Sequence, residues 1–178
     1  MAMDRKAVLR RNIRILTWFF IIGLLISGAT AIPLDAEISL LARWFHVDGN
    51  ANANAPAGSS SSSPASTEVT QWLSRVQTAL TQTKQNFPFL FYGTDWLAFG
   101  HFVIAVAFIG PLRDPVRNRW LFVFGMIACT LVVPYALIFG AVRGIPFWWR
   151  LIDCSFGVFG FVPMWLCHKW AIELESPI

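Results

Sequence analysis

The sequence predicts an all-α integral membrane protein with four transmembrane helices and two short amphipathic helices in the first outer loop. Of its 178 residues, 56% are hydrophobic and only 13% are charged, against about 45–50% and about 25% in a typical soluble domain. Its 16 Phe and 9 Trp, with a mean hydropathy of +0.55, give more apolar surface than so short a chain can bury in its own core. The net charge of +4 comes without a basic stripe interleaved with aromatic residues away from the membrane flanks, so nucleic acid is not an expected partner.

The first apolar run covers residues 13–32, with Arg14 as its single charge, and has the length of about 20 residues that crosses the hydrocarbon core. A secretory signal peptide is the alternative, because a basic segment precedes the run and Ala29-Thr30-Ala31 fits a small-x-small cleavage site. We expect a retained signal anchor. Later apolar runs at residues 96–112, 120–142 and 145–167 predict three more spanning helices.

Residues 33–95 form the sizeable extramembrane segment. Apolar residues at helical spacing predict an amphipathic helix over residues 35–46 that lies on the membrane. A second helix is expected to begin with Ser66 as N-cap and to carry an apolar stripe, which packs on a partner protein, on the bundle or on lipid headgroups. The stripe consists of Val69, Trp72, Leu73, Val76 and Leu80, and the candidate partner interface is Val69, Trp72, Val76 and Leu80.

Two connections complete this outer segment. Residues 49–65, with Ser59 to Ser63, have the composition of a linker. Residues 87–93 are aromatic and are expected along the outer membrane interface. Asp95 is the expected N-cap of the next helix.

Basic residues predict the orientation. Nine flank the membrane on one side, namely Arg5, Lys6, Arg10, Arg11, Arg14, Arg113, Arg117, Arg119 and Lys169, and five lie on the other, namely Arg43, Arg75, Lys84, Arg143 and Arg150. The positive-inside rule therefore places both termini in the cytoplasm. The expected layout is a cytoplasmic N-terminus and first span over residues 1–32, an outer segment over 33–95, a three-helix bundle over 96–167 and a cytoplasmic tail over 168–178.

His101 and Asp153 are ionisable side chains that fall inside the predicted spans, and such groups are costly in lipid. His101 and Asp153 each lie five residues past a boundary tryptophan, about 7–8 Å deep at the helical rise, and Tyr135 lies about 10 Å below the same boundary. With Arg150 one turn above Asp153 on the same helix face, these residues predict a polar cluster. It is either a structural clasp between helices, which we expect, or a proton-handling or ligand-binding site.

No cofactor is expected to bind directly. The histidines are His46, His101 and His168, and no two of them are placed to hold one haem between them. A single axial histidine suffices for a chlorophyll-type pigment, so pigment contact through His101 stays open. No metal site is expected.

Small and sulfur-containing residues predict packing rather than chemistry. Cys129, Cys154 and Cys167 form no Cys-x-x-Cys pair and are expected to be buried free thiols. Gly157 and Gly160 predict a small-residue face for close helix approach. Walker, nucleophile-elbow and His-Glu-x-x-His patterns do not occur in the sequence.

Three segments carry a resemblance. Residues 92–101 (YGTDWLAFGH), 110–118 (GPLRDPVRN) and 143–157 (RGIPFWWRLIDCSFG) resemble a family of small bacterial four-helix membrane proteins without an assigned activity, over residues 87–170. The chain is also similar to an accessory subunit of bacterial photosynthetic reaction-centre and antenna complexes. The resemblance implies no site residues.

The sequence leads us to expect one of two alternative functions. The first is a non-catalytic accessory or structural subunit of a larger energy-transducing membrane complex, photosynthetic or respiratory. Its partners would be the lipid bilayer and other subunits of that complex, including pigment-binding ones. The second is a small membrane transporter or enzyme that uses His101 and Asp153.

Overall fold

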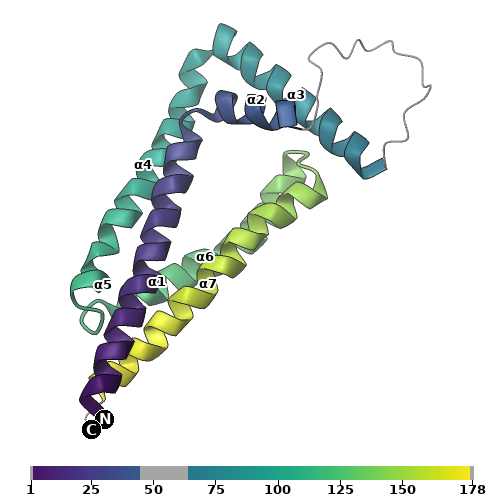
Figure 1. Cartoon of the computed structure of the whole chain (residues 1–178). Coiled ribbons are helices and arrows are strands. Elements are labelled where there is room, and N and C mark those ends of the chain that lie inside the picture. Colours follow the sequence, from purple (N-terminus) through teal and green to yellow (C-terminus); the bar gives the residue numbers. More distant parts are fainter. Residues whose placement is uncertain (1, 45–63, 177–178) are drawn as a thin grey trace. The chain divides into compact units, whose positions relative to one another are not determined.

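The computed structural model describes residues 2–44 and 64–176, and the regular elements in these ranges are all helices. They are α1 (Ala2–Ala31), α2 (Leu34–Trp44), α3 (Pro64–Asn86), the 3₁₀ turn η1 (Pro88–Phe91), α4 (Tyr92–Ala107), α5 (Ile109–Arg113), α6 (Arg119–Val142) and α7 (Phe147–Glu175) (Figure 1). The predicted all-α class is confirmed for the described residues. His46 and most of the predicted linker lie outside them.

Four segments are long and apolar enough to cross a membrane, as predicted. They are Arg5–Ala31, Pro88–Arg113, Arg119–Val142 and Phe147–Glu175. The helix α7 continues to Glu175 and so includes eight residues that the sequence places in a tail. Length and composition therefore support the four predicted spans.

Both predicted N-caps are wrong. The helix α3 begins at Pro64, two residues before Ser66, because proline is preorganised for the first turn of a helix. Asp95 lies inside α4, which begins at Tyr92 directly after η1. The Thr94 hydroxyl donates to the Phe91 carbonyl at 2.7 Å in that first turn.

The chain divides into two compact units, one of residues 1–25 and 102–178 and the other of residues 26–101. We call them the first and the second unit. The first contains most of α1 together with α5, α6 and α7, and the second contains α2, α3 and most of α4.

Aromatic and small side chains fill the core of the first unit. Phe108 and Phe122 are fully buried, as are Ile13 and Met164, and the rings of Phe20 and Phe108 lie 4.7 Å apart. The buried Thr17 hydroxyl donates to the Ile13 carbonyl at 2.7 Å, so this polar group is satisfied within α1. Residues from four helices thus share one core.

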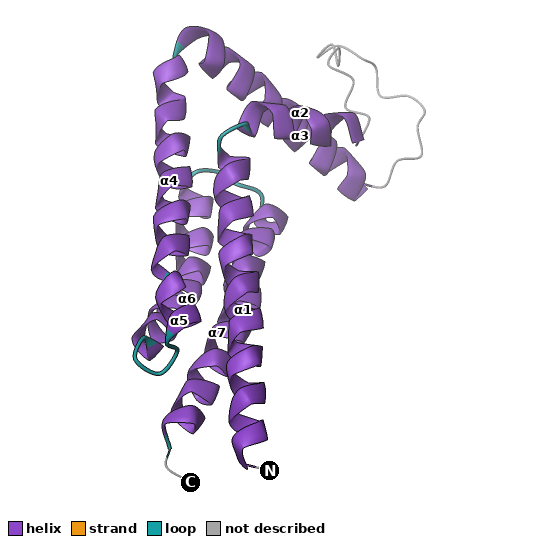
Figure 2. Cartoon of the chain, turned by 60° about the vertical axis from the view of Figure 1, so that its left-hand side comes forward, coloured by secondary structure: helices purple, strands orange, loops and turns teal. Residues whose placement is uncertain are grey.

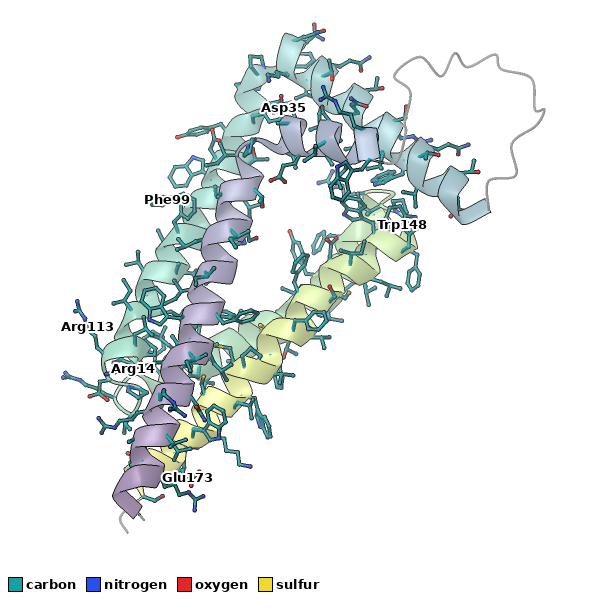
Figure 3. The ribbon with its side chains drawn as sticks, in the orientation of Figure 1. Arg14, Asp35, Phe99, Arg113, Trp148 and Glu173 are labelled. Carbon is teal, nitrogen blue, oxygen red and sulfur yellow. The ribbon has the colours of Figure 1, made fainter. Side chains whose placement is uncertain are left out.

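Ion pairs join the helix ends that meet at one end of the first unit. Arg5 pairs with Glu173, and Arg119 pairs with Glu175, so the beginnings of α1 and α6 lie beside the end of α7 (Figure 2; Glu173 is labelled in Figure 3). Each pair is solvent-exposed and contributes about 0–1 kcal/mol. These ends carry the basic residues that the sequence assigns to one side of the membrane.

In the second unit, α2 lies along α3 (Figure 1). Ile38 and Ala42 of α2 lie one helical turn apart and are buried, and Leu73 of α3 is 2% exposed. Asp35 at the start of α2 pairs with Lys84 near the end of α3. The hydrogen bond from Lys84 lowers the pKa of the Asp35 carboxyl below its ordinary value.

We expect Asp35→Asn to loosen the α2–α3 contact at neutral pH. Because the pKa of Asp35 is lowered in the folded chain, its contribution is present above the unfolded pKa of about 3.9 and is lost as the pH falls through the folded pKa. Hydrogen exchange of the α2 amides should be faster in the variant at pH 7 and equal in the two proteins at acid pH. Equal exchange at pH 7 would contradict a stabilising pair.

Candidate functional site

The turn between α6 and α7 places the arginines of the candidate site. Gly144 has a φ of 69°, the left-handed region that glycine adopts without strain. The amide of Ile145 donates to the Gly140 carbonyl at 2.8 Å and that of Gly144 to the Ala141 carbonyl at 3.1 Å, which is the Schellman arrangement of a helix end. The helix α6 thus ends at Val142, and Pro146 is the N-cap residue of α7.

Glycines and a cysteine let α6 and α7 approach closely. A Cβ atom on Gly157 would lie 2.5 Å from the Cys129 carbonyl oxygen, and one on Gly160 would lie 2.7 Å from the Cys129 sulfur. A Cβ atom on Gly125 would lie 2.9 Å from Met164. We call Gly125, Cys129, Gly157 and Gly160 the α6–α7 seam. It agrees with the small-residue face predicted from Gly157 and Gly160.

Arg150 joins α7 to α6 at the end of this hairpin next to the turn. Its guanidinium donates through Nη1 to the Leu137 carbonyl at 3.3 Å and lies 5.3 Å from the centre of the Phe147 ring. Its aliphatic stem occupies the space that a Cβ atom on Gly140 would take, 2.5 Å from Cδ. Its buried Nε–H has no hydrogen-bond partner within the described chain.

An open groove of about 720 Å³ runs along α6. Its lining residues follow one another at three- and four-residue intervals, which is one face of a helix, and Asp153 of α7 joins them. We call it the α6 groove; it is lined by Ala128, Leu131, Val132, Tyr135, Ala136, Phe139, Gly140, Arg143, Ile145 and Asp153. The rings of Tyr135 and Phe139 lie 4.6 Å apart in its wall.

The structure brings together only some residues of the predicted polar cluster. Tyr135 and Asp153 line the same groove, and Arg150 lies one turn before Asp153 on α7 but donates to α6. Among the described residues, the Asp153 carboxylate makes no ion pair or hydrogen bond. The clasp therefore stays a prediction.

His101 belongs to the second unit, whereas the other three residues of the cluster belong to the first. Its Nδ1 lies 2.8 Å from the Leu97 carbonyl of its own helix. A carbonyl accepts, so Nδ1 is the donor in this bond. In the neutral imidazole, Nε2 then has the lone pair that a pigment metal would need.

Two further predictions concern the cysteines and a metal site. Cys129, Cys154 and Cys167 are free thiols in the described chain, two of them buried. The Cys154 sulfur lies 3.9 Å from the Val133 carbonyl and the Cys167 sulfur 3.9 Å from the Ile13 carbonyl, so both face neighbouring helices. Within the same residues, no group of three or more His, Cys, Asp or Glu side chains is placed to hold a metal ion.

The candidate partner interface on α3 is only partly covered. We call the predicted apolar stripe of this helix, Val69, Trp72, Leu73, Val76 and Leu80, the α3 stripe. Its Leu73 is buried, whereas the other four residues are half-buried. The Trp72 indole N–H is buried without a hydrogen-bond partner in the described residues. Packing on α2 thus accounts for one part of this stripe.

Sequence reasoning missed Gly140, Phe139 and Arg143 as site residues. Gly140 and Arg150 each lie five residues from Ile145, and an antiparallel hairpin brings residues equidistant from its turn together. The equal distances from Ile145 could therefore have identified the contact between Gly140 and Arg150 from the sequence.

No family model, curated protein or solved structure matches the chain.

Proposed function

We propose that the chain is an integral protein of a bacterial inner membrane, with both termini cytoplasmic and residues 33–95 outside. Four helices of spanning length and composition support insertion. The nine-to-five distribution of basic residues supports the orientation. The ion pairs Arg5–Glu173 and Arg119–Glu175 also support this orientation. They bring the beginnings of α1 and α6 to the end of α7, so these three helix ends must lie on the same side of the membrane.

Cysteine labelling tests this orientation. A cysteine introduced at Ser61, outside the described residues, should react with an impermeant thiol reagent applied to intact spheroplasts, because it would lie on the outer side. A cysteine at Ser176 should react only after the membrane is ruptured. The unmodified chain measures the background from its three native cysteines. The reverse pattern would contradict the orientation.

We further propose that the protein serves as a non-catalytic accessory subunit of a larger energy-transducing complex, photosynthetic or respiratory. The observation that carries this proposal is the exposure of large aromatic side chains on α6 and α7: Phe159 is 74% exposed, Phe156 67% and Trp120 60%. Aromatic residues are enriched where subunits pack against one another. An apolar helix surface of this kind suits contact with neighbouring membrane helices as well as with lipid.

The α3 stripe adds a second surface outside the membrane. Its half-buried members leave apolar area uncovered by α2, and this area suits contact with a partner protein.

Copurification tests the subunit proposal. After extraction in a mild detergent, the protein should run in a complex much larger than 20.0 kDa with the same proteins in a constant ratio. The same preparation in a harsh detergent serves as the dissociated control. A pigment-free and cofactor-free monomer in mild detergent would contradict the proposal.

The α6 groove favours a second candidate, a small transporter or membrane enzyme. Asp153 and Tyr135 line it together, and a half-buried carboxylate at membrane depth is a frequent mark of ion or substrate pathways. An isolated protein that retains transport or catalysis, and loses it in Asp153→Asn, would support this candidate over the first.

A further inference from the structure

The dimensions of the α6 groove restrict what it can hold. Its lining on α6 runs from Ala128 to Arg143, about 22 Å at the helical rise. Its volume of about 720 Å³ is therefore spread along several helical turns. An elongated open groove with mainly apolar walls suits a hydrocarbon chain.

The charges of the groove are separated along its length. Arg143 lies at the outer end, is exposed and makes no ion pair within the described residues. The guanidinium of Arg150 lies near the same end, held on the Leu137 carbonyl. Asp153 lies deeper, because its neighbour Cys154 faces Val133 on α6. Val133 is ten residues before Arg143, so the level of Asp153 is about 15 Å from Arg143 along the helix axis.

Apart from Tyr135, the α6 walls of the groove are apolar or small. Ala136 and Phe139 lie between the levels of Arg143 and Asp153, and Leu131 and Val132 lie at or beyond the level of Asp153. A molecule that fits must carry an anionic group at one end and a long apolar chain along the rest. An anionic phospholipid has this shape and charge.

We propose that the α6 groove binds one anionic phospholipid, with its phosphate against Arg143 and one acyl chain along Leu131, Val132 and Phe139. This inference rests on the membrane insertion proposed above and is independent of the subunit role. The lipid belongs to the outer leaflet, because Arg143 lies on the side opposite the paired ends of α1 and α7. Asp153 opposes binding by repelling the phosphate from a distance.

Native mass spectrometry of the purified protein tests the proposal with dioleoyl-phosphatidylglycerol as the probe and dioleoyl-phosphatidylcholine as the zwitterionic comparison. The wild-type chain should retain one phosphatidylglycerol in preference to phosphatidylcholine. Arg143→Gln should weaken retention roughly tenfold, since a hydrogen bond to a charged group is lost. Asp153→Asn should strengthen it roughly fivefold, because a repulsion across about 15 Å is removed.

Two further variants separate the groove from the general lipid surface. Ala136→Phe places a ring in the groove and should abolish retention, whereas Val158→Phe adds the same ring to a side chain of α7 that is 59% exposed and lies outside the groove lining, and should leave retention unchanged. Arg117→Gln, at the other end of the hairpin, is the matched charge control. Circular dichroism confirms that each variant is folded.

The outcomes distinguish the two proposals. Sedimentation with membranes is measured first, and a chain recovered in the soluble fraction would overturn both membrane insertion and the lipid site. An inserted chain that retains no lipid, or whose retention is the same in Arg143→Gln, Asp153→Asn and wild type, would overturn only the lipid site. An inserted monomer with one bound lipid supports the site and contradicts the subunit role.

Discussion

Gly157→Ala is expected to destabilise the protein by about 1–3 kcal/mol, the usual cost of overpacking a close contact. The new Cβ atom would lie 2.5 Å from the Cys129 carbonyl oxygen, a backbone atom that cannot rotate away. The seam must therefore open along part of α6 and α7. Thermal unfolding in detergent, followed by circular dichroism, measures the effect.

Gly23→Ala is the matched control. Gly23 lies in α1, and nothing lies within 4 Å of the Cβ atom that alanine would add. Because alanine favours a helix over glycine by about 1 kcal/mol, this variant should be as stable as the wild type or more stable. Equal effects of the two substitutions would show that the close approach at Gly157 is not a source of stability.

The double substitution of Trp72 and Val76 by serine is expected to release the protein from the proposed complex. Removing a tryptophan from an interface centre commonly costs about 2 kcal/mol or more, which is roughly a thirtyfold loss of affinity. The amount of each copurifying protein per chain, after mild extraction, measures the loss. Trp44→Ser, which shortens a tryptophan that is 76% exposed on α2, is the control.

The contact between α2 and α3 must be separated from contact with a partner. Leu73→Ser removes a buried side chain of the same stripe and should accelerate hydrogen exchange in α2. If the double variant accelerates that exchange as much as Leu73→Ser does, the stripe stabilises the second unit itself. Unchanged occupancy of the complex in the double variant would place the partner interface on the spanning helices.

The elements of the fold could be predicted from sequence because the signals are local. Length and hydropathy of each run are sufficient to identify four helices of spanning size, since a helix satisfies its own backbone and needs no information from distant residues. The starts of α3 and α4 were misplaced because several residues near a helix end can serve as cap. Pro64 and the turn at Pro88–Phe91 determine where these helices begin.

The contacts between elements required the tertiary structure. Spacing along the chain places Tyr135 and Asp153 at similar depths, with Arg150 one turn above Asp153. The rotation of α6 and α7 about their axes decides that Arg150 lies over Gly140 while Asp153 lines the groove. Spacing likewise identifies the stripe on α3, but the structure places α2 along α3 and pairs Asp35 with Lys84.

The sequence by itself thus determined the helices, their apolar character and the grouping of basic residues at their ends, because each depends on neighbours along the chain. Only the tertiary structure decided that Gly157 meets the backbone at Cys129 and that one face of α6 forms a groove ending at Arg143. These features depend on how two helices are turned and aligned against each other, and many alignments share the same pattern of apolar residues.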